Sequence, residues 1–149
     1  MTAYLDNSAT TPVCGEAVEA MKTAVTELWG NPSSLHQKGI EADEMLENAR
    51  SNVARKLFCR DDEVYFTSGG TESNNLAVQG AAHAMRRRGR RIVTTSVEHP
   101  SIDETVKHLE NEGFEVIRLG VDKNGRISER ELFDAVTPDT ILVSIMAVN

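Results

Sequence analysis

The chain has 149 residues, of which 40% are hydrophobic and 26% charged, an ordinary composition for one globular domain. Its formal net charge of −7 argues against a nucleic-acid partner. No stretch approaches 18 uninterrupted apolar residues and no secretory pattern opens the chain, so we expect no membrane span. Two cysteines, Cys14 and Cys59, are too few for a disulfide framework. We therefore expect a cytoplasmic protein, and no residue cluster points to a metal.

The predicted elements begin with two helices, over 15–28 and about 34–58, where apolar residues recur at three- and four-residue spacing. From residue 63 onward, strands and helices alternate. The predicted strands are 63–68, 91–97, 114–121 and 140–148, and the predicted helices are 71–88, 101–112 and one starting at Ser128.

Local stop and start residues support these boundaries. Gly113 suits the C-terminal cap of a helix, and "DKNG" (122–125) is typical of a turn. "SERE" (128–131) matches a capping box, in which Ser128 caps the helix and Glu131 reaches back.

The alternation predicts an α/β fold with a mostly parallel sheet and flanking helices. In such folds, ligands bind where strands end and helices begin. The strand predicted at 140–148 is followed only by Asn149. We therefore expect an incomplete large domain, whose last strand exposes apolar surface when the chain is alone.

The stretch "FTSGGTESNN" (66–75) joins a β-rich run to a helix through two glycines. Gly69 and Gly70 allow the backbone to turn sharply, and the helix start near Thr71 offers unpaired N–H groups and a partial positive charge. Such a junction favours a phosphate or carboxylate. From the residues alone, a simple tight turn capped by Thr71 is as good an explanation.

His99 follows the next predicted strand, in "SVEHPS" (96–101). The ends of neighbouring parallel strands lie side by side, so His99 and Thr71 are expected to share one crevice. An imidazole there can stack on a planar ring or move protons. Taken alone, His99 is explained better as a solvated loop histidine beside a helix-start proline, and only its place at a strand end favours a functional role.

Five motifs carry a family resemblance. They are "YLDNSATT" (4–11), "GNPSSLH" (30–36), "FTSGGTESNN" (66–75), "EHPS" (98–101) and "ILVSIMAVN" (141–149). Their order and spacing resemble the NifS/IscS-like cysteine desulfurases, which are pyridoxal-phosphate enzymes of the class V aminotransferase group. The resemblance covers essentially the whole chain and about the first two-fifths of the family's usual length.

The resemblance implies the fold type I architecture of pyridoxal-phosphate transferases, a homodimer, and removal of sulfur from L-cysteine to give L-alanine and an enzyme persulfide. The sulfur would pass to an iron–sulfur scaffold or another acceptor protein. By position, Gly70 and Thr71 match the phosphate-binding pair, and His99 matches the catalytic histidine that stacks on the cofactor ring. The matched substrate-side residues are Asn7, Ala9, Thr10, Asn31 and His36. Residues 1–14 are thus a substrate-side segment, and 15–149 an incomplete cofactor-binding domain.

In this family the cofactor-bound lysine and the persulfide cysteine lie farther along the chain. Cys14 and Cys59 match neither position, so we expect residues 1–149 alone to be inactive. A related selenocysteine or C–S lyase, or a non-catalytic half-domain that pairs with a partner, remain alternatives. The arginine run 86–91 is explained most simply by the helix dipole, and otherwise as a surface for an acidic acceptor protein.

Overall fold

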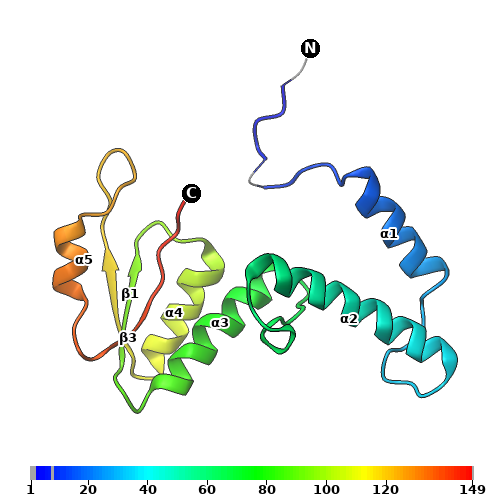
Figure 1. Ribbon diagram of the computed structural model, residues 1–149. Helices are drawn as coiled ribbons and strands as arrows, with labels where there is room; N and C mark the ends of the chain where they lie inside the picture. Colours follow the sequence, from blue (N-terminus) through cyan, green and yellow to red (C-terminus); the bar gives the residue numbers. More distant parts are fainter. Residues whose placement is uncertain (1–2, 8, 149) are drawn as a thin grey trace. The chain divides into compact units, whose positions relative to one another are not determined.

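The computed structural model describes residues 3–7 and 9–148, and the chain divides into two compact units, 1–66 and 67–149 (Figure 1). The first unit holds α1 (Gly15–Thr26), α2 (Gln37–Leu57) and the short 3-10 helix η1 (Asp61–Glu63). The second holds α3 (Gly70–Met85), β1 (Arg91–Thr95), α4 (Pro100–Asn111), β2 (Glu115–Leu119), α5 (Glu129–Ala135) and β3 (Thr140–Val143).

The first unit is built on α2. The imidazole of His36 caps its start, and the chain approaches so closely there that a Cβ on Gly39 would lie 2.1 Å from the carbonyl oxygen of Ser34. Phe58 ends the helix in the left-handed region, at φ 56°. Helix α1 has no buried residue, so the apolar face predicted for it remains exposed.

The second unit is built on a three-stranded sheet in the order β2-β1-β3. Both strand pairs are parallel, with Val93 of β1 opposite Ile117 of β2 and Val143 of β3. The predicted parallel α/β fold is therefore confirmed. Figure 1 shows α3 and α4 on one side of the sheet and α5 on the other.

The core lies between the central strand and the two helices α3 and α4. Ile92, Val106 and Leu109 are fully buried in it, with Val78 and Ala82 of α3 packed beside them. Four consecutive residues of β1, Ile92 to Thr95, are buried, because both faces of a parallel sheet are covered. None of the described helices is long and apolar enough to cross a membrane.

The prediction of a strand at 63–68 is wrong. Residues 61–63 form η1, and 64–67 are irregular, although Val64 itself is extended at φ −101° and ψ 121°. A strand exists only when its backbone pairs with a neighbour, and in the described residues the sheet consists of β1, β2 and β3. The β-branched and aromatic composition favours an extended backbone, which Val64 adopts, but it carries no information about a pairing partner.

The strand predicted at 140–148 is shorter and less buried than expected. It ends at Val143, and its residues are half-buried or exposed because it pairs on one side only. Beyond it, Ser144 N–H still bonds to the carbonyl oxygen of Val93, but Met146 N–H bonds to the side chain of Glu98. Ile145 and Val148 are 38% and 84% exposed, which agrees with the expectation of exposed apolar surface here.

Candidate functional site

The glycine turn at the start of α3 presents open backbone donors. Gly69 is the N-cap residue, and its carbonyl oxygen accepts the first helical bond, from Ser73 N–H at 3.1 Å. Within the part of the chain that the structure describes, no acceptor is recorded for the N–H groups of Gly70 and Thr71. A Cβ on Gly69 or Gly70 would meet nothing within 4 Å, so the space beside these donors is open. The turn can therefore receive an anion.

Side chains brace the same turn from within. The carboxylate of Glu72 accepts from both the hydroxyl and the N–H of Ser68, at 2.6 and 2.7 Å. These two hydrogen bonds hold the pKa of Glu72 below its usual value. Thr67 Oγ1 lies 2.7 Å from Ser73 Oγ and donates to Gly69 O at 3.1 Å. The turn is thus fixed before any ligand arrives, which lowers the entropic cost of binding.

A crevice of about 420 Å³ lies along the packed helices α3 and α4. It is lined by residues of both helices, including Thr71, Asn75, Gln79, His99, Ser101 and Thr105. The structure therefore brings Thr71 and His99 into one crevice, as expected, but it does so by placing α3 beside α4, because no strand precedes α3 in the described residues. Gly70 lies beside the crevice as the first residue of α3.

His99 occupies the N-cap position of α4. The following Pro100 favours an extended backbone at His99 and stands at the first helical position, where its missing N–H is not needed. His99 Nδ1 accepts from the N–H of Ser101 at 3.1 Å and lies 2.8 Å from the Ser101 hydroxyl. The imidazole is consequently fixed at the crevice wall by the helix that it caps.

A polar stripe along α3 forms the opposite wall, and sequence reasoning missed it. Asn75 Nδ2 donates to Thr71 O at 2.8 Å, while Asn75 Oδ1 accepts from Gln79 at 3.1 Å and from Thr105 of α4 at 2.8 Å. The four-residue spacing of Thr71, Asn75 and Gln79 was the available signal, because residues i and i+4 share a helix face.

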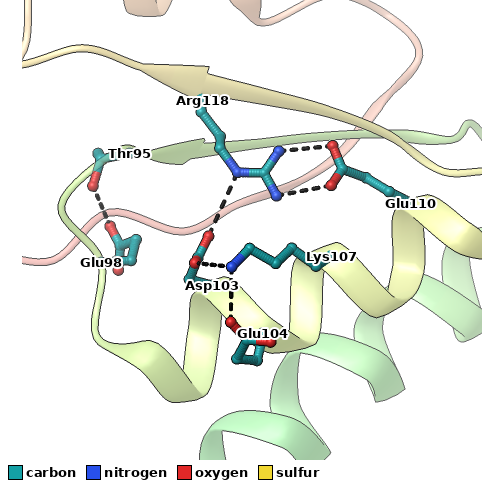
Figure 2. A network of polar contacts seen from close by, with 7 residues as sticks. All are labelled: Thr95, Glu98, Asp103, Glu104, Lys107, Glu110 and Arg118. Atoms are coloured by element: carbon teal, nitrogen blue, oxygen red, sulfur yellow. Dashed lines mark hydrogen bonds and ion pairs between the residues drawn. The ribbon is translucent and has the colours of Figure 1, made fainter.

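Glu98 was also missed. One of its carboxylate oxygens accepts from the Thr95 hydroxyl at 2.7 Å, a contact drawn in Figure 2, and from Met146 N–H at 2.8 Å. Glu98 thereby joins the end of β1 to the segment after β3. This fixes the carboxyl edge of the sheet just before His99.

A second polar network, drawn in Figure 2, fastens α4 to β2. The guanidinium of Arg118 makes two bonds to Glu110, at 2.7 and 2.9 Å, and Lys107 reaches Asp103 and Glu104 at 2.8 and 2.7 Å. The bond from Lys107 holds the pKa of Asp103 low, and the bond from Arg118 does the same for Glu110. Lys107 is thus an ion-paired lysine, and the residues that line the crevice include no lysine.

The candidate substrate-side residues of the first motif lie in an exposed segment of the first unit. Asn7 Nδ2 contacts Tyr4 O at 3.5 Å, and the N–H groups of Ala9 and Thr10 bond to Asp6 O at 3.2 and 3.4 Å. Asn7 and Thr10 also line a shallow cavity of about 540 Å³ together with Tyr4. The segment therefore gathers two of the predicted residues at one small surface.

Asn31 and His36 have local structural partners. Asn31 Oδ1 accepts from Ser33 N–H at 3.0 Å, and His36 Nδ1 accepts from Gly39 N–H at 3.3 Å. Both bonds stabilise the approach to α2. Their expected role toward a substrate remains a prediction.

The remaining chemistry-bearing groups add little to the site. Cys14 is exposed and Cys59 half-buried, and both are free thiols. Among the described residues, no group of histidine, cysteine and carboxylate side chains is arranged to hold a metal ion.

Comparison with known proteins defines the class. Residues 3–149 match the family described as Aminotransferase class-V, so the chain belongs to this family of pyridoxal-phosphate enzymes. It is 53% identical over 146 residues to a NifS/IcsS protein homolog of Lactobacillus delbrueckii subsp. bulgaricus, a match that covers 98% of this chain and 38% of that protein. It is 49% identical over 146 residues to the cysteine desulfurase IscS of Methanosarcina thermophila, covering 98% of this chain and 36% of that protein.

Solved structures of similar proteins support the same family assignment. A NifS-like protein matches with a TM-score of 0.91 and 43% identity, over 100% of this chain and 41% of that one. A structure described as SspA in complex with cysteine matches with a TM-score of 0.87 and 35% identity, over 99% of this chain and 43% of that one. The fold type I architecture and the resemblance to NifS/IscS-like proteins are therefore confirmed. This chain spans about two-fifths of the length of these relatives.

Proposed function

We propose that this chain supplies the phosphate cradle and the ring-facing histidine of a pyridoxal-phosphate-dependent cysteine desulfurase. The reaction takes L-cysteine to L-alanine and leaves its sulfur as an enzyme persulfide. The sulfur then passes to an iron–sulfur scaffold or another acceptor protein. The observation that carries this proposal is the single crevice that joins Thr71 and His99.

The residues present fit the cofactor. A phosphate needs donors, and the N–H groups of Gly70 and Thr71 stand at a helix start, where a Cβ built on Gly69 or Gly70 would meet no described atom within 4 Å. A planar ring needs a flat neighbour, and the imidazole of His99, which caps α4, lies on the crevice wall. Pyridoxal phosphate, when bound, serves as the electron sink for the bond changes at the amino acid.

The chain's own residues have separate tasks in this proposal. Thr71 adds a hydroxyl donor beside the backbone N–H groups, so a phosphate would meet several hydrogen-bond donors at the start of α3. Asn75 bonds to the Thr71 carbonyl oxygen and so holds the first turn of α3 in place. Asn7, Ala9, Thr10, Asn31 and His36 are proposed to face the amino-acid substrate in the assembled enzyme.

A phosphate-dependent binding experiment tests the cradle. We would titrate the ¹⁵N-labelled chain with pyridoxal phosphate and, separately, with pyridoxal, which lacks the phosphate. Pyridoxal phosphate is expected to shift the amide signals of Gly70 and Thr71, and pyridoxal is not. Thr71→Ala should weaken binding by about tenfold, the cost of one charge-assisted hydrogen bond. Thr23→Ala, on exposed α1, is the matched control and should change nothing. Equal shifts with both ligands would contradict the proposal.

A covalent readout separates binding from activity. Borohydride treatment of the pyridoxal-phosphate mixture should leave no adduct concentrated on one lysine, because the residues that line the crevice include no lysine. Digestion and mass spectrometry would show this. One uniquely labelled lysine would show that the chain anchors the cofactor by itself.

A non-catalytic half-domain that pairs with a partner is favoured by one observation. Met21 and Val25 of α1 are 61% and 74% exposed, and Leu57 at the end of α2 is 66% exposed. Apolar surface of this extent is typical of a protein interface. The family resemblance makes a second copy of this chain the proposed partner. Separately, the free thiols of Cys14 and Cys59 suit a cytoplasmic setting. Sedimentation equilibrium of the chain should show a dimer, and a monomer at every concentration would contradict this assignment.

A further inference from the structure

A chain of hydrogen bonds reaches His99 from the neighbouring helix. Asn74 Nδ2 of α3 lies 2.8 Å from Ser101 Oγ of α4, and Ser101 Oγ lies 2.8 Å from His99 Nδ1. The backbone N–H of Ser101 lies 3.1 Å from the same imidazole nitrogen. Two groups of Ser101 therefore converge on Nδ1.

The chemistry of the partners fixes the direction of this chain. An amide NH₂ group can only donate, so Ser101 Oγ accepts from Asn74. The single hydroxyl proton of Ser101 is then left to donate to His99 Nδ1. The Ser101 backbone N–H can also only donate. Both bonds require a lone pair on Nδ1, so the neutral ring carries its proton on Nε2.

The surroundings preserve this arrangement. Ser101 is only 8% exposed, so its hydroxyl does not exchange partners freely with solvent. Thr105 bonds to the carbonyl oxygen of Ser101 at 2.7 Å and holds the first turn of α4. In the described residues, no group bonds to Nε2 of His99.

We propose that Ser101 and Asn74 are positioning residues that fix His99 as an Nε2–H donor at the crevice. The ring then offers a hydrogen-bond donor, and not a lone pair, to an acceptor atom of the bound ligand. This inference rests on the proposed function insofar as that ligand is pyridoxal phosphate. Neither residue touches the ligand in this account, and both act through His99.

A histidine can cap a helix without the additional hydrogen bonds from Asn74 and Ser101. His36 caps α2 through the same kind of bond, from Gly39 N–H to Nδ1 at 3.3 Å, and no side chain is recorded on its ring among the described contacts. The arm from Asn74 through Ser101 is therefore an addition to the cap. His36 serves as the internal control for it.

The test is the ring tautomer of His99, read from long-range ¹H–¹⁵N spectra of the full chain without cofactor. In the wild-type chain, the neutral His99 ring should be protonated at Nε2. A neutral imidazole favours that tautomer even when free, so the informative measurement is the response to substitution.

Asn74→Asp is the decisive variant because it keeps the shape of the side chain but reverses the direction of the hydrogen bond between residue 74 and the Ser101 hydroxyl. The introduced carboxylate only accepts, so the Ser101 hydroxyl must donate to it and loses its proton toward Nδ1. We expect the tautomer ratio of His99 to move toward Nδ1–H by about tenfold, the scale of one hydrogen bond. Ser101→Ala should move the His99 tautomer ratio in the same direction by a smaller factor. Ser101→Thr keeps the hydroxyl and should retain the wild-type ratio. The ratio of His36 should not change in any variant.

Two results separate this inference from the proposed function. If Asn74→Asp leaves the His99 ratio within about twofold of wild type while the amide spectrum shows a folded α4, the positioning role is wrong. If the variants respond as expected but pyridoxal phosphate never perturbs the His99 ring signals, the positioning role stands and the cofactor assignment fails.

Discussion

The two units of the chain bury their apolar residues to very different degrees. In the second unit, Ile92, Val106 and Leu109 are fully buried between the sheet and its helices. In the first unit, Met21 and Val25 of α1 are 61% and 74% exposed. The sheet makes the difference, since it gives a flat apolar face to both neighbouring helices. Helical periodicity alone therefore predicts a helix but not what covers it.

The largest expected effect contrasts two large-to-small substitutions. Leu109→Ala, in the core of the second unit, should lower the free energy of unfolding by roughly 3–4 kcal/mol through lost burial and a cavity. Met21→Ala, on the exposed face of α1, should change it by less than about 0.5 kcal/mol. Urea denaturation followed by circular dichroism measures both. Equal losses would mean that α1 is packed as tightly as α4.

A pair of glycines gives the next contrast. A Cβ on Gly89 would lie 2.2 Å from the backbone oxygen of Asp139, so Gly89→Ala should destabilise the second unit by roughly 2 kcal/mol. Gly80, inside α3, has nothing within 4 Å of a built Cβ. Gly80→Ala should therefore stabilise the same unit by about 0.5–1 kcal/mol, through better helix propensity. Thermal melts of the two variants should shift in opposite directions.

Two adjacent threonines of β1 test hydrogen-bond satisfaction. Thr94 is 1% exposed, and its hydroxyl has no hydrogen-bond partner among the described residues. Thr94→Val should therefore raise the free energy of unfolding by about 1 kcal/mol. Thr95 donates to Glu98, so Thr95→Val should lower it by about 1–2 kcal/mol. Denaturant midpoints that move in the same direction for both would contradict the assigned contacts.

The smallest effect is electrostatic. Arg118 lowers the pKa of Glu110 below its usual value near 4.5, because the two side chains share two hydrogen bonds. A carboxyl whose pKa is lower in the folded chain stabilises it above the unfolded pKa, and this stabilisation is lost as the pH falls through the folded pKa. Glu110 is 37% exposed, so solvent screening limits the effect to roughly 0.5–1 kcal/mol.

The matched variant is Glu110→Gln, which keeps the shape and removes the charge. Its deficit relative to wild type should be full at pH 7, shrink once the pH drops below about 4.5, and vanish in stronger acid. Unfolding measured at several pH values gives this profile. A deficit that is constant with pH would assign the loss to packing instead of charge.

The sequence predicted the second unit better than the first, for physical reasons. The helices and parallel strands from residue 70 onward follow from periodicity, glycine caps and the Ser128 cap, which are local signals. The strand predictions for 63–68 and for the end of 140–148 were wrong because the pairing of one strand with another depends on residues distant in the sequence. The sequence predicted that Thr71 and His99 share a crevice, but from a strand at 63–68 that the structure does not contain. The arm from Asn74 through Ser101 was not predicted, because a side-chain contact between two helices, across 27 positions of sequence, leaves no local signal.

The central claim is that the planar ring of pyridoxal phosphate lies against His99. Transferred nuclear Overhauser effects from the single ring proton and the ring methyl group of the cofactor to the histidine side chains test it directly. We predict contacts to His99 that disappear in His99→Ala, and none to His83, which bonds to Glu112 outside the crevice. Bound cofactor that shows contacts to another histidine and none to His99 would contradict the account.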